Sequence, residues 1–253
     1  MIVSSRWGGS GAFETMRVYR GTPFAWRRHM ERLDAAARAL GITPPASTRV
    51  REGVDAVVHA NGLANSRVRV TLMSRPGDAD ADVIVAASAF VPARRPARVV
   101  TAAWPRNERA ATVGVKSTSY TDNVRAFADA RARGADECVF ANTRGELCEA
   151  TGSNVFVVER GVVRTPPASS GCLLGVTRAL VLELARADGI PVEEVAMPLA
   201  ALARSEEAFL TSTTREVQPI ETVDGQPRRR SPGPVTSRLA ARFAELVSRD
   251  LDP

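Results

Sequence analysis

Lysine is almost missing from this sequence. The chain has 34 Lys and Arg residues in total, and since Lys116 is the single lysine, the other 33 are arginine. On a surface arginine replaces lysine well, but a guanidinium stays protonated and cannot serve as a neutral amine. Two interpretations of Lys116 are therefore open at this point: a leftover surface residue, or an amine with a chemical function. The preceding Val113, Gly114 and Val115 are small and apolar, which favours the end of a buried strand over a solvated face.

Other scarce residue types argue against several further classes of protein. Three cysteines, an odd number without the spacing of metal ligands, argue against a disulfide framework or a zinc site, and no metal is predicted. Two distant histidines, His29 and His59, leave little material for a Ser-His-Asp triad. No apolar run approaches the ~20 residues of a membrane helix, and the first residues lack the apolar centre of a signal peptide. We therefore expect a cytoplasmic protein without a membrane partner.

The charge is basic but dispersed. A net charge of +6 raises the question of nucleic acid, yet the arginines are scattered and aromatic residues make up only 5% of the chain. A stacking platform for bases is therefore not expected, and neither is a nucleic-acid partner. A non-enzymatic arginine-rich binding protein is kept as an alternative, and it predicts salt-sensitive nucleic-acid binding.

Apolar periodicity predicts an α+β protein with two domains, residues 1–104 and 105–253. Alternating or short apolar runs predict strands, and stripes with helical spacing predict amphipathic helices. Strands are expected at 13–19, 66–74, 82–91 and 97–104, and two hairpins at 137–151 and 154–167. Helices are expected at 24–42, 48–60, 121–133, 175–190 and 237–250.

Several residues with chemical potential accompany these elements. Lys116 is expected to follow a strand, Glu149 to lie in one, and Arg32 to lie on the first helix. Two further segments suit an anion: a helix that opens at Gly175, and "TSTTREV" after an apolar strand, because glycine turns and helix starts present N–H groups. Pyridoxal phosphate needs such a set, namely an unprotonated lysine amine, a carboxylate at the pyridine nitrogen and donors for the phosphate.

These segments resemble the class IV aminotransferase family, the fold type IV pyridoxal-phosphate enzymes. The family contains branched-chain and D-amino acid aminotransferases and 4-amino-4-deoxychorismate lyase. The resemblance rests on the order and spacing of "GAFETMR", "HMERL", "VKSTSY", "ELCEATGSNVF", "TPPASSGCLLGVTR" and "EEAFLTSTTREVQPI". It implies a two-domain fold type IV enzyme that binds pyridoxal 5′-phosphate and a small amino substrate and forms a homodimer.

The resemblance also implies a role for individual residues. Lys116 would be the Schiff-base lysine and proton shuttle, and Tyr120 would lie close to the reacting atoms. The other cofactor contacts would come from Arg32, Glu149, Asn154, Val176, Thr177, Ser212 and Thr213. The substrate contacts would come from Arg106, Arg109 and Thr214.

The reaction itself is a separate question. The segment from "GAFETMR" to "HMERL", and Arg106-Asn107 ahead of Lys116, are most similar to the lyase branch, which serves folate biosynthesis. An arginine fork at Arg106 or Arg109 would suit a substrate carboxylate, although both arginines also fit an exposed linker. The first hypothesis is therefore a lyase that converts 4-amino-4-deoxychorismate to 4-aminobenzoate and pyruvate. The alternative is a branched-chain or D-amino acid aminotransferase.

Overall fold

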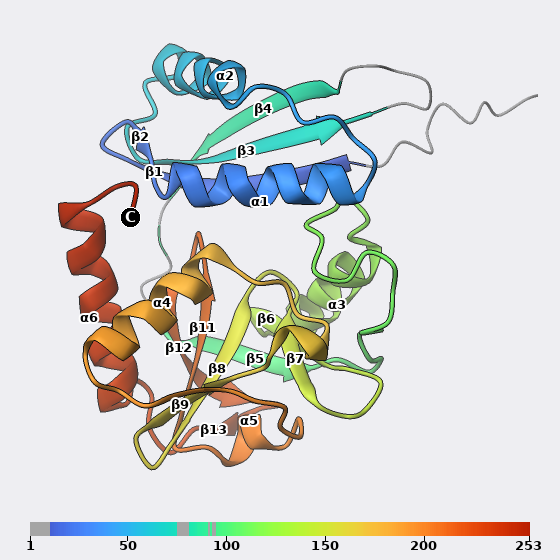
Figure 1. The fold of residues 1–253 in the computed structure, drawn as a ribbon. Coiled ribbons are helices and arrows are strands. Elements are labelled where there is room, and N and C mark those ends of the chain that lie inside the picture. Colours follow the sequence, from blue (N-terminus) through green and yellow to red (C-terminus); the bar gives the residue numbers. More distant parts are fainter. Residues whose placement is uncertain (1–10, 75–80, 91, 93–94) are drawn as a thin grey trace, which may run out of the picture. The chain divides into compact units, whose positions relative to one another are not determined.

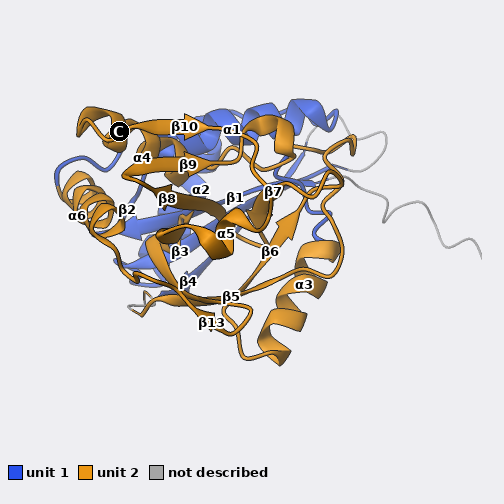
Figure 2. Cartoon of the chain, turned by 90° about the horizontal axis from the view of Figure 1, so that it is seen from below, with its two compact units in different colours: residues 1–91, 115–120, 249–253 blue, residues 92–114, 121–248 orange. Residues whose placement is uncertain are grey.

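The computed structural model describes residues 11–74, 81–90, 92 and 95–253, and it has a mixed α+β fold, as predicted (Figure 1). The chain divides into two compact units, which are coloured separately in Figure 2. Unit 1 takes residues 1–91, 115–120 and 249–253, and unit 2 takes residues 92–114 and 121–248. Each unit is described by itself.

Unit 1 is a four-stranded antiparallel sheet with two helices. The strands run in the order β2-β1-β3-β4. Their bounds are β1 Gly11–Tyr19, β2 Thr22–Pro23, β3 Ser66–Met73 and β4 Asp82–Ala89, and the helices are α1 Trp26–Ala39 and α2 Ser47–Ala60. Alternate positions of β1 and β3 pack with the apolar stripes of both helices in one core.

A charged residue, Glu14, lies among the core residues of unit 1. In β1 the residues Ala12, Met16 and Val18 are fully buried in this core, and Glu14 has the same alternation. Successive side chains of a strand point to opposite faces, so Glu14 lies on the same face as the three apolar residues. A carboxylate there must find partners, because an unpaired buried charge is very costly.

Unit 2 is built on a nine-stranded mixed sheet. The order is β10-β9-β8-β11-β12-β5-β6-β7, with β13 paired to β12. The strands are β5 Ala97–Thr101, β6 Glu137–Ala141, β7 Leu147–Ala150, β8 Asn154–Glu159, β9 Val162–Thr165, β10 Val192–Glu194, β11 Glu207–Ser212, β12 Glu216–Val223 and β13 Gln226–Pro227. The helices are α3 Thr121–Ala132, α4 Val176–Ala187, α5 Ala201–Arg204 and α6 Pro234–Arg249, with a short 3₁₀ turn at Ala168–Ser170.

The units do not follow the division expected from the sequence. The strand β5, expected in the first domain, pairs in parallel with β6 and β12 and so belongs to the large sheet of unit 2. Residues 115–120 return to unit 1, where Ser117 bridges Ala12 of β1. Both exceptions come from pairings between segments distant in sequence, which local periodicity does not reveal.

The expected strand ahead of Lys116 is also not formed. Residues 109–114 are turns, and Gly114 has a φ of +74°, in the left-handed region that glycine tolerates and extended strands do not use. Lys116 is thus presented by a loop that runs along the edge of β1. Among the helices of the described ranges, none has the length and apolar character needed to cross a membrane.

Candidate functional site

Lys116 lies against aromatic rings in unit 1. Its Nζ is 4.6 Å from the ring centre of Phe13 and 5.8 Å from that of Tyr120, and these two rings meet edge to face at 5.2 Å. The backbone oxygen of Lys116 accepts a hydrogen bond of 3.0 Å from the Phe13 N–H. Because this bond and the Ser117 bridge fix the loop on β1, the lysine side chain has a defined, half-buried position beside Tyr120.

Arg32 is held by the buried Glu14. Its Nε and Nη2 donate to the two carboxylate oxygens at 2.7 and 2.8 Å, and His29 Nδ1 lies 2.7 Å from Glu14 Oε2. This forked contact fixes the plane of the guanidinium. His29 and Arg32 are three residues apart on α1, so they share the helix face that meets β1.

The three groups set one another's protonation. Burial alone would raise the pKa of Glu14, but the charge of Arg32 and contact with His29 outweigh it and hold that pKa far below its usual range. Burial lowers the pKa of His29, an effect that Glu14 only partly opposes. We therefore describe His29 as a neutral imidazole whose Nδ1–H donates to an ionised Glu14. Lys116 also lowers the pKa of His29, so its charge lies within electrostatic range of this group.

Glu149 is the central carboxylate of unit 2. It lies on β7 with 12% of its side chain exposed. Its Oε2 accepts a 2.9 Å hydrogen bond from the Leu173 N–H, and its Oε1 lies 3.3 Å from Nη2 of Arg106. A backbone donor and a cation both favour the ionised carboxylate.

The start of α4 lies next to Asn154, the first residue of β8. Asn154 Nδ2 donates to the backbone oxygen of Leu173 at 2.6 Å. Gly175 precedes the helix, and a Cβ there would come within 2.2 Å of Asn154 Oδ1, so no larger residue fits without displacing the amide. Among the side chains that the structure describes, none caps this helix start, and Val176 and Thr177 form its first turn. The first N–H groups of such a helix suit an anion.

The end of β11 and the turn after it carry three hydroxyl residues. Ser212 Oγ accepts from the backbone N–H of Arg215 at 3.2 Å and lies 3.5 Å from Thr214 Oγ1, and Ser212, Thr213 and Thr214 are all half-buried. Thr211 pairs with Asn154 across β11 and β8, so this turn lies at the same end of the sheet as the start of β8. In the described part of the chain, the buried Thr211 hydroxyl has no hydrogen-bond partner.

The two arginines assigned to the substrate have different surroundings. Arg106 donates to Asn123 Oδ1 at 3.2 Å, lies over the ring of Phe140 and contacts Glu149. Arg109 leaves 83% of its side chain exposed, and its Nε is 3.8 Å from Glu108.

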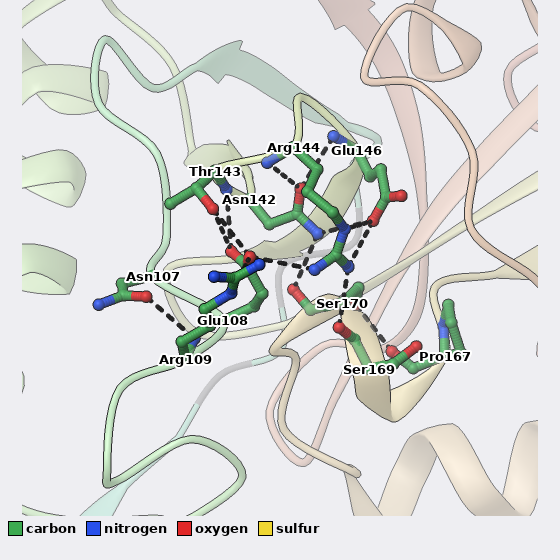
Figure 3. Close-up of polar contacts among 10 residues, drawn as sticks. All are labelled: Asn107, Glu108, Arg109, Asn142, Thr143, Arg144, Glu146, Pro167, Ser169 and Ser170. Carbon is green, nitrogen blue, oxygen red and sulfur yellow. Dashed lines mark hydrogen bonds and ion pairs between the residues drawn. The ribbon is translucent and has the colours of Figure 1, made fainter.

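Glu108 anchors the segment that carries Arg109 (Figure 3). It accepts hydrogen bonds from the backbone N–H and the hydroxyl of Thr143. It also forms an ion pair with Arg144. These contacts lower the pKa of Glu108 to about 2, chiefly through the Thr143 hydroxyl. Arg144 in turn reaches Glu146 and the Ser169 carbonyl, so residues 107–109 are joined to the β6–β7 turn and the 3₁₀ turn.

Each unit by itself offers groups that suit pyridoxal phosphate. Unit 1 has a lysine amine, a tyrosine and a fixed guanidinium. Unit 2 has a carboxylate that contacts a backbone N–H and an arginine, and a helix start with no room for a Cβ at Gly175. Among the residues that the structure describes, no side chain caps this helix and the buried Thr211 hydroxyl has no hydrogen-bond partner. The residues present therefore fit the cofactor that the resemblance implies.

Comparison with known proteins decides the family. The sequence profile of the amino-transferase class IV family matches residues 11–223. The chain belongs to this family. This confirms the family that the sequence motifs indicated.

Three relatives define what is shared. A D-alanine aminotransferase from Listeria monocytogenes is 30% identical over 95% of this chain and 88% of its own length. A branched-chain aminotransferase from Thermus thermophilus, solved with N-(5′-phosphopyridoxyl)-L-glutamate, is 28% identical with a TM-score of 0.86 and covers 94% of this chain and 85% of its own. A provisionally named 4-amino-4-deoxychorismate lyase from Legionella pneumophila has a TM-score of 0.90 over 97% of this chain and 94% of its own. At 24% identity that last likeness shows the fold alone.

These relatives confirm the predicted fold type and, at the level of the family, the predicted cofactor. The class IV family is a family of pyridoxal-phosphate enzymes, and the Thermus member carries a phosphopyridoxyl group.

The supporting residues around the site were not predicted from the sequence. Glu14, Glu137 and Arg215 each make buried ion pairs beside predicted residues. For Glu14 a local signal exists, since the strand alternation places it among the apolar positions 12, 16 and 18. For Glu137 and Arg215, 78 residues apart in the numbering, no local pattern points to the pairing.

Proposed function

We propose that the chain is a pyridoxal-phosphate-dependent aminotransferase that moves an amino group from an amino acid to a 2-oxo acid. The family match over residues 11–223 carries this proposal. Relatives that are 28–30% identical over nearly the whole chain are named as aminotransferases, and they support transfer over elimination. When bound, pyridoxal phosphate supplies an electron sink for negative charge at the substrate α-carbon.

Lys116 would take the proton from the substrate α-carbon and return it. The role needs an amine that can lose its own proton, which the 33 arginines cannot supply. The Phe13 and Tyr120 rings beside Nζ fix where that amine lies. Tyr120 would orient the amine and the substrate from the same loop.

We assign one arginine and several neutral donors to the phosphate of the cofactor. Arg32 would bind the phosphate, with Glu14 fixing its guanidinium plane. The first turn of α4 at Val176 and Thr177 would donate to the phosphate as well, with Ser212 and Thr213.

Glu149 would pair with the pyridine nitrogen and keep it protonated. The Leu173 N–H and Arg106 favour its ionised form, which is the form this pairing needs. Asn154, bonded to the same short segment through the Leu173 carbonyl, would support this part of the site.

We propose Arg106, Arg109 and Thr214 as the substrate-binding residues, and the surroundings of the two arginines favour Arg109. Arg106 already contacts Glu149 and Asn123, whereas Arg109 is 83% exposed and its nearest carboxylate, Glu108, is also bound to Thr143 and Arg144. Arg109 is thus the better placed of the two for a substrate carboxylate, with Thr214 as a hydroxyl donor. A homodimer stays a prediction from the family.

A specific observation keeps the lyase as a second candidate. The segment from "GAFETMR" to "HMERL" and the Arg106-Asn107 pair are most similar to the lyase branch. The deciding experiment measures pyruvate release from 4-amino-4-deoxychorismate beside amino transfer from alanine, glutamate and branched-chain donors of both hands. Amino transfer alone supports the proposal, and pyruvate release alone replaces it with the lyase.

Lys116→Ala and Lys116→Arg test the central residue in either reaction. Both variants should lose turnover, because alanine has no amine and arginine does not deprotonate. Turnover at the wild-type rate in Lys116→Ala would refute the assignment. Circular dichroism of both variants checks that the fold is kept.

A further inference from the structure

Two turns lie at one end of the large sheet of unit 2. Residues 151–153 join β7 to β8 and lie between Glu149 and Asn154. Residues 213–215 join β11 to β12. Because Asn154 pairs with Thr211 across β8 and β11, the two turns leave the same end of the sheet. Each turn carries or adjoins residues that we assign to the cofactor.

One buried carboxylate contacts both turns. Glu137, the first residue of β6, is only 2% exposed. It accepts hydrogen bonds from the hydroxyls of Thr151 and, at 3.1 Å, Ser153. Its Oε2 also lies 3.2 Å from Nη2 of Arg215 in the other turn.

Arg215 is fixed at several further points. Nη1 donates to Gln218 Oε1 at 2.5 Å, and Nη2 donates to the backbone oxygen of Asp136 at 2.9 Å. Its backbone N–H donates to Ser212 Oγ at 3.2 Å. The planar guanidinium thus joins the β11–β12 turn to the start of β6, and the same residue holds the Ser212 hydroxyl.

We propose that Glu137 and Arg215 are positioning residues that hold these two turns in the arrangement that binds the cofactor. The inference rests on the proposed function, since it assigns Ser212, Thr213 and Asn154 to pyridoxal phosphate. Donors that are fixed before binding lose less conformational freedom when the ligand arrives, so fixed turns bind more tightly. Breaking the Glu137–Arg215 pair leaves the donors present and removes what orders them.

The same unit offers a matched control. Glu207 is also 2% exposed, and it accepts hydrogen bonds from the N–H groups of Val235 and Thr236 and from the Thr236 hydroxyl. These contacts lie at the start of α6, and none of them involves either turn. Glu207→Ala should therefore destabilise unit 2 much as Glu137→Ala does, without changing the turns.

The test compares pyridoxal phosphate binding by the apoprotein, by equilibrium dialysis, with urea unfolding of the same samples. Glu137→Ala and Arg215→Ala should raise the dissociation constant by about tenfold or more, the order of magnitude by which loss of a supporting outer-shell partner weakens a metal site. Glu137→Gln preserves the shape of the side chain, and Arg215→Lys preserves its charge. Both variants should fold, and their dissociation constants should lie between that of the wild type and those of the alanine variants. Glu207→Ala should lower the urea midpoint without raising the dissociation constant.

The outcomes separate this inference from the function on which it rests. A wild-type apoprotein that does not bind pyridoxal phosphate removes the proposed function and the inference with it. Wild-type binding with unchanged affinity in Glu137→Gln and Arg215→Lys overturns the inference alone. An equal loss of affinity in Glu137→Ala and Glu207→Ala also overturns it, because a general loss of stability would then explain both.

Discussion

Replacement of Glu14 by alanine should destabilise the protein far more than an ordinary charge substitution. Glu14 is fully buried, and its two oxygens receive Arg32 Nε at 2.7 Å, Arg32 Nη2 at 2.8 Å and His29 Nδ1 at 2.7 Å. Removing it leaves the Arg32 guanidinium without its carboxylate partner at a position where only 17% of that side chain meets water. Breaking one side of a buried ion pair costs about 3–5 kcal/mol.

The remaining exposure of Arg32 places the expected loss at the lower end of that range, about 3 kcal/mol. For a chain of this size each kcal/mol shifts Tm by about 2–4 °C, so the variant should melt about 6–12 °C lower. Urea unfolding of the apoprotein followed by circular dichroism measures the free energy directly, and Glu14→Gln should show a smaller loss because the amide oxygen can still accept one hydrogen bond.

A surface ion pair in the same unit provides the control. Arg51 and Asp55 pair one turn apart on α2, with 38% and 50% of their side chains exposed. Asp55→Ala should cost about 0.5 kcal/mol or less. A loss below about 1 kcal/mol in Glu14→Ala, within the range of such exposed pairs, would refute the view that the Glu14 contacts hold Arg32 and α1 on β1.

Three further predictions concern buried or closely packed groups. Because the pKa values of both His29 and Glu14 are lowered in the folded protein, the unfolded chain takes up protons first. The free energy of unfolding should thus fall as the pH drops below about 6.5, and fall further below about 4.3, and urea midpoints that do not change from about pH 8 to 4 would contradict this. Burial raises the pKa of Cys138 to about 11, so a thiol reagent should label it only after unfolding, and rapid labelling of the native protein would show the thiol to be accessible. Gly175→Ala should displace the Asn154 amide and cost about 1 kcal/mol, and wild-type urea stability would indicate that the amide moves freely.

The sequence predicts the elements of this fold well where one face of an element is apolar. The stripe on α1 and the alternation in β3 arise from helical and strand geometry, and both elements form close to the expected bounds. The hairpins β6–β7 and β8–β9 follow from glycine turns between apolar runs. Such signals are local, so one chain is enough to read them.

Local sequence signals do not predict how these strands pair into sheets. The strand β5 reads like any short apolar strand, and only its parallel pairing with β6 and β12 assigns it to unit 2. The same limit applies to the site. Motifs single out Lys116 and Glu149 as candidate residues, but the contacts of Arg106 with Glu149 and of Arg215 with Glu137 span 43 and 78 positions of the sequence.

Three of the arginines and the single lysine illustrate how the two cationic side chains differ. Arg32, Arg106 and Arg215 each contact a carboxylate that is at most 12% exposed: Glu14, Glu149 and Glu137. A guanidinium suits this task, because it stays charged and presents planar donors that match the geometry of a carboxylate. The property that makes arginine a reliable partner for these carboxylates also prevents it from giving up a proton. The aminotransferase that we propose moves a proton at the substrate α-carbon, so it would need a different side chain at one position, and Lys116 of "VKSTSY" would supply it.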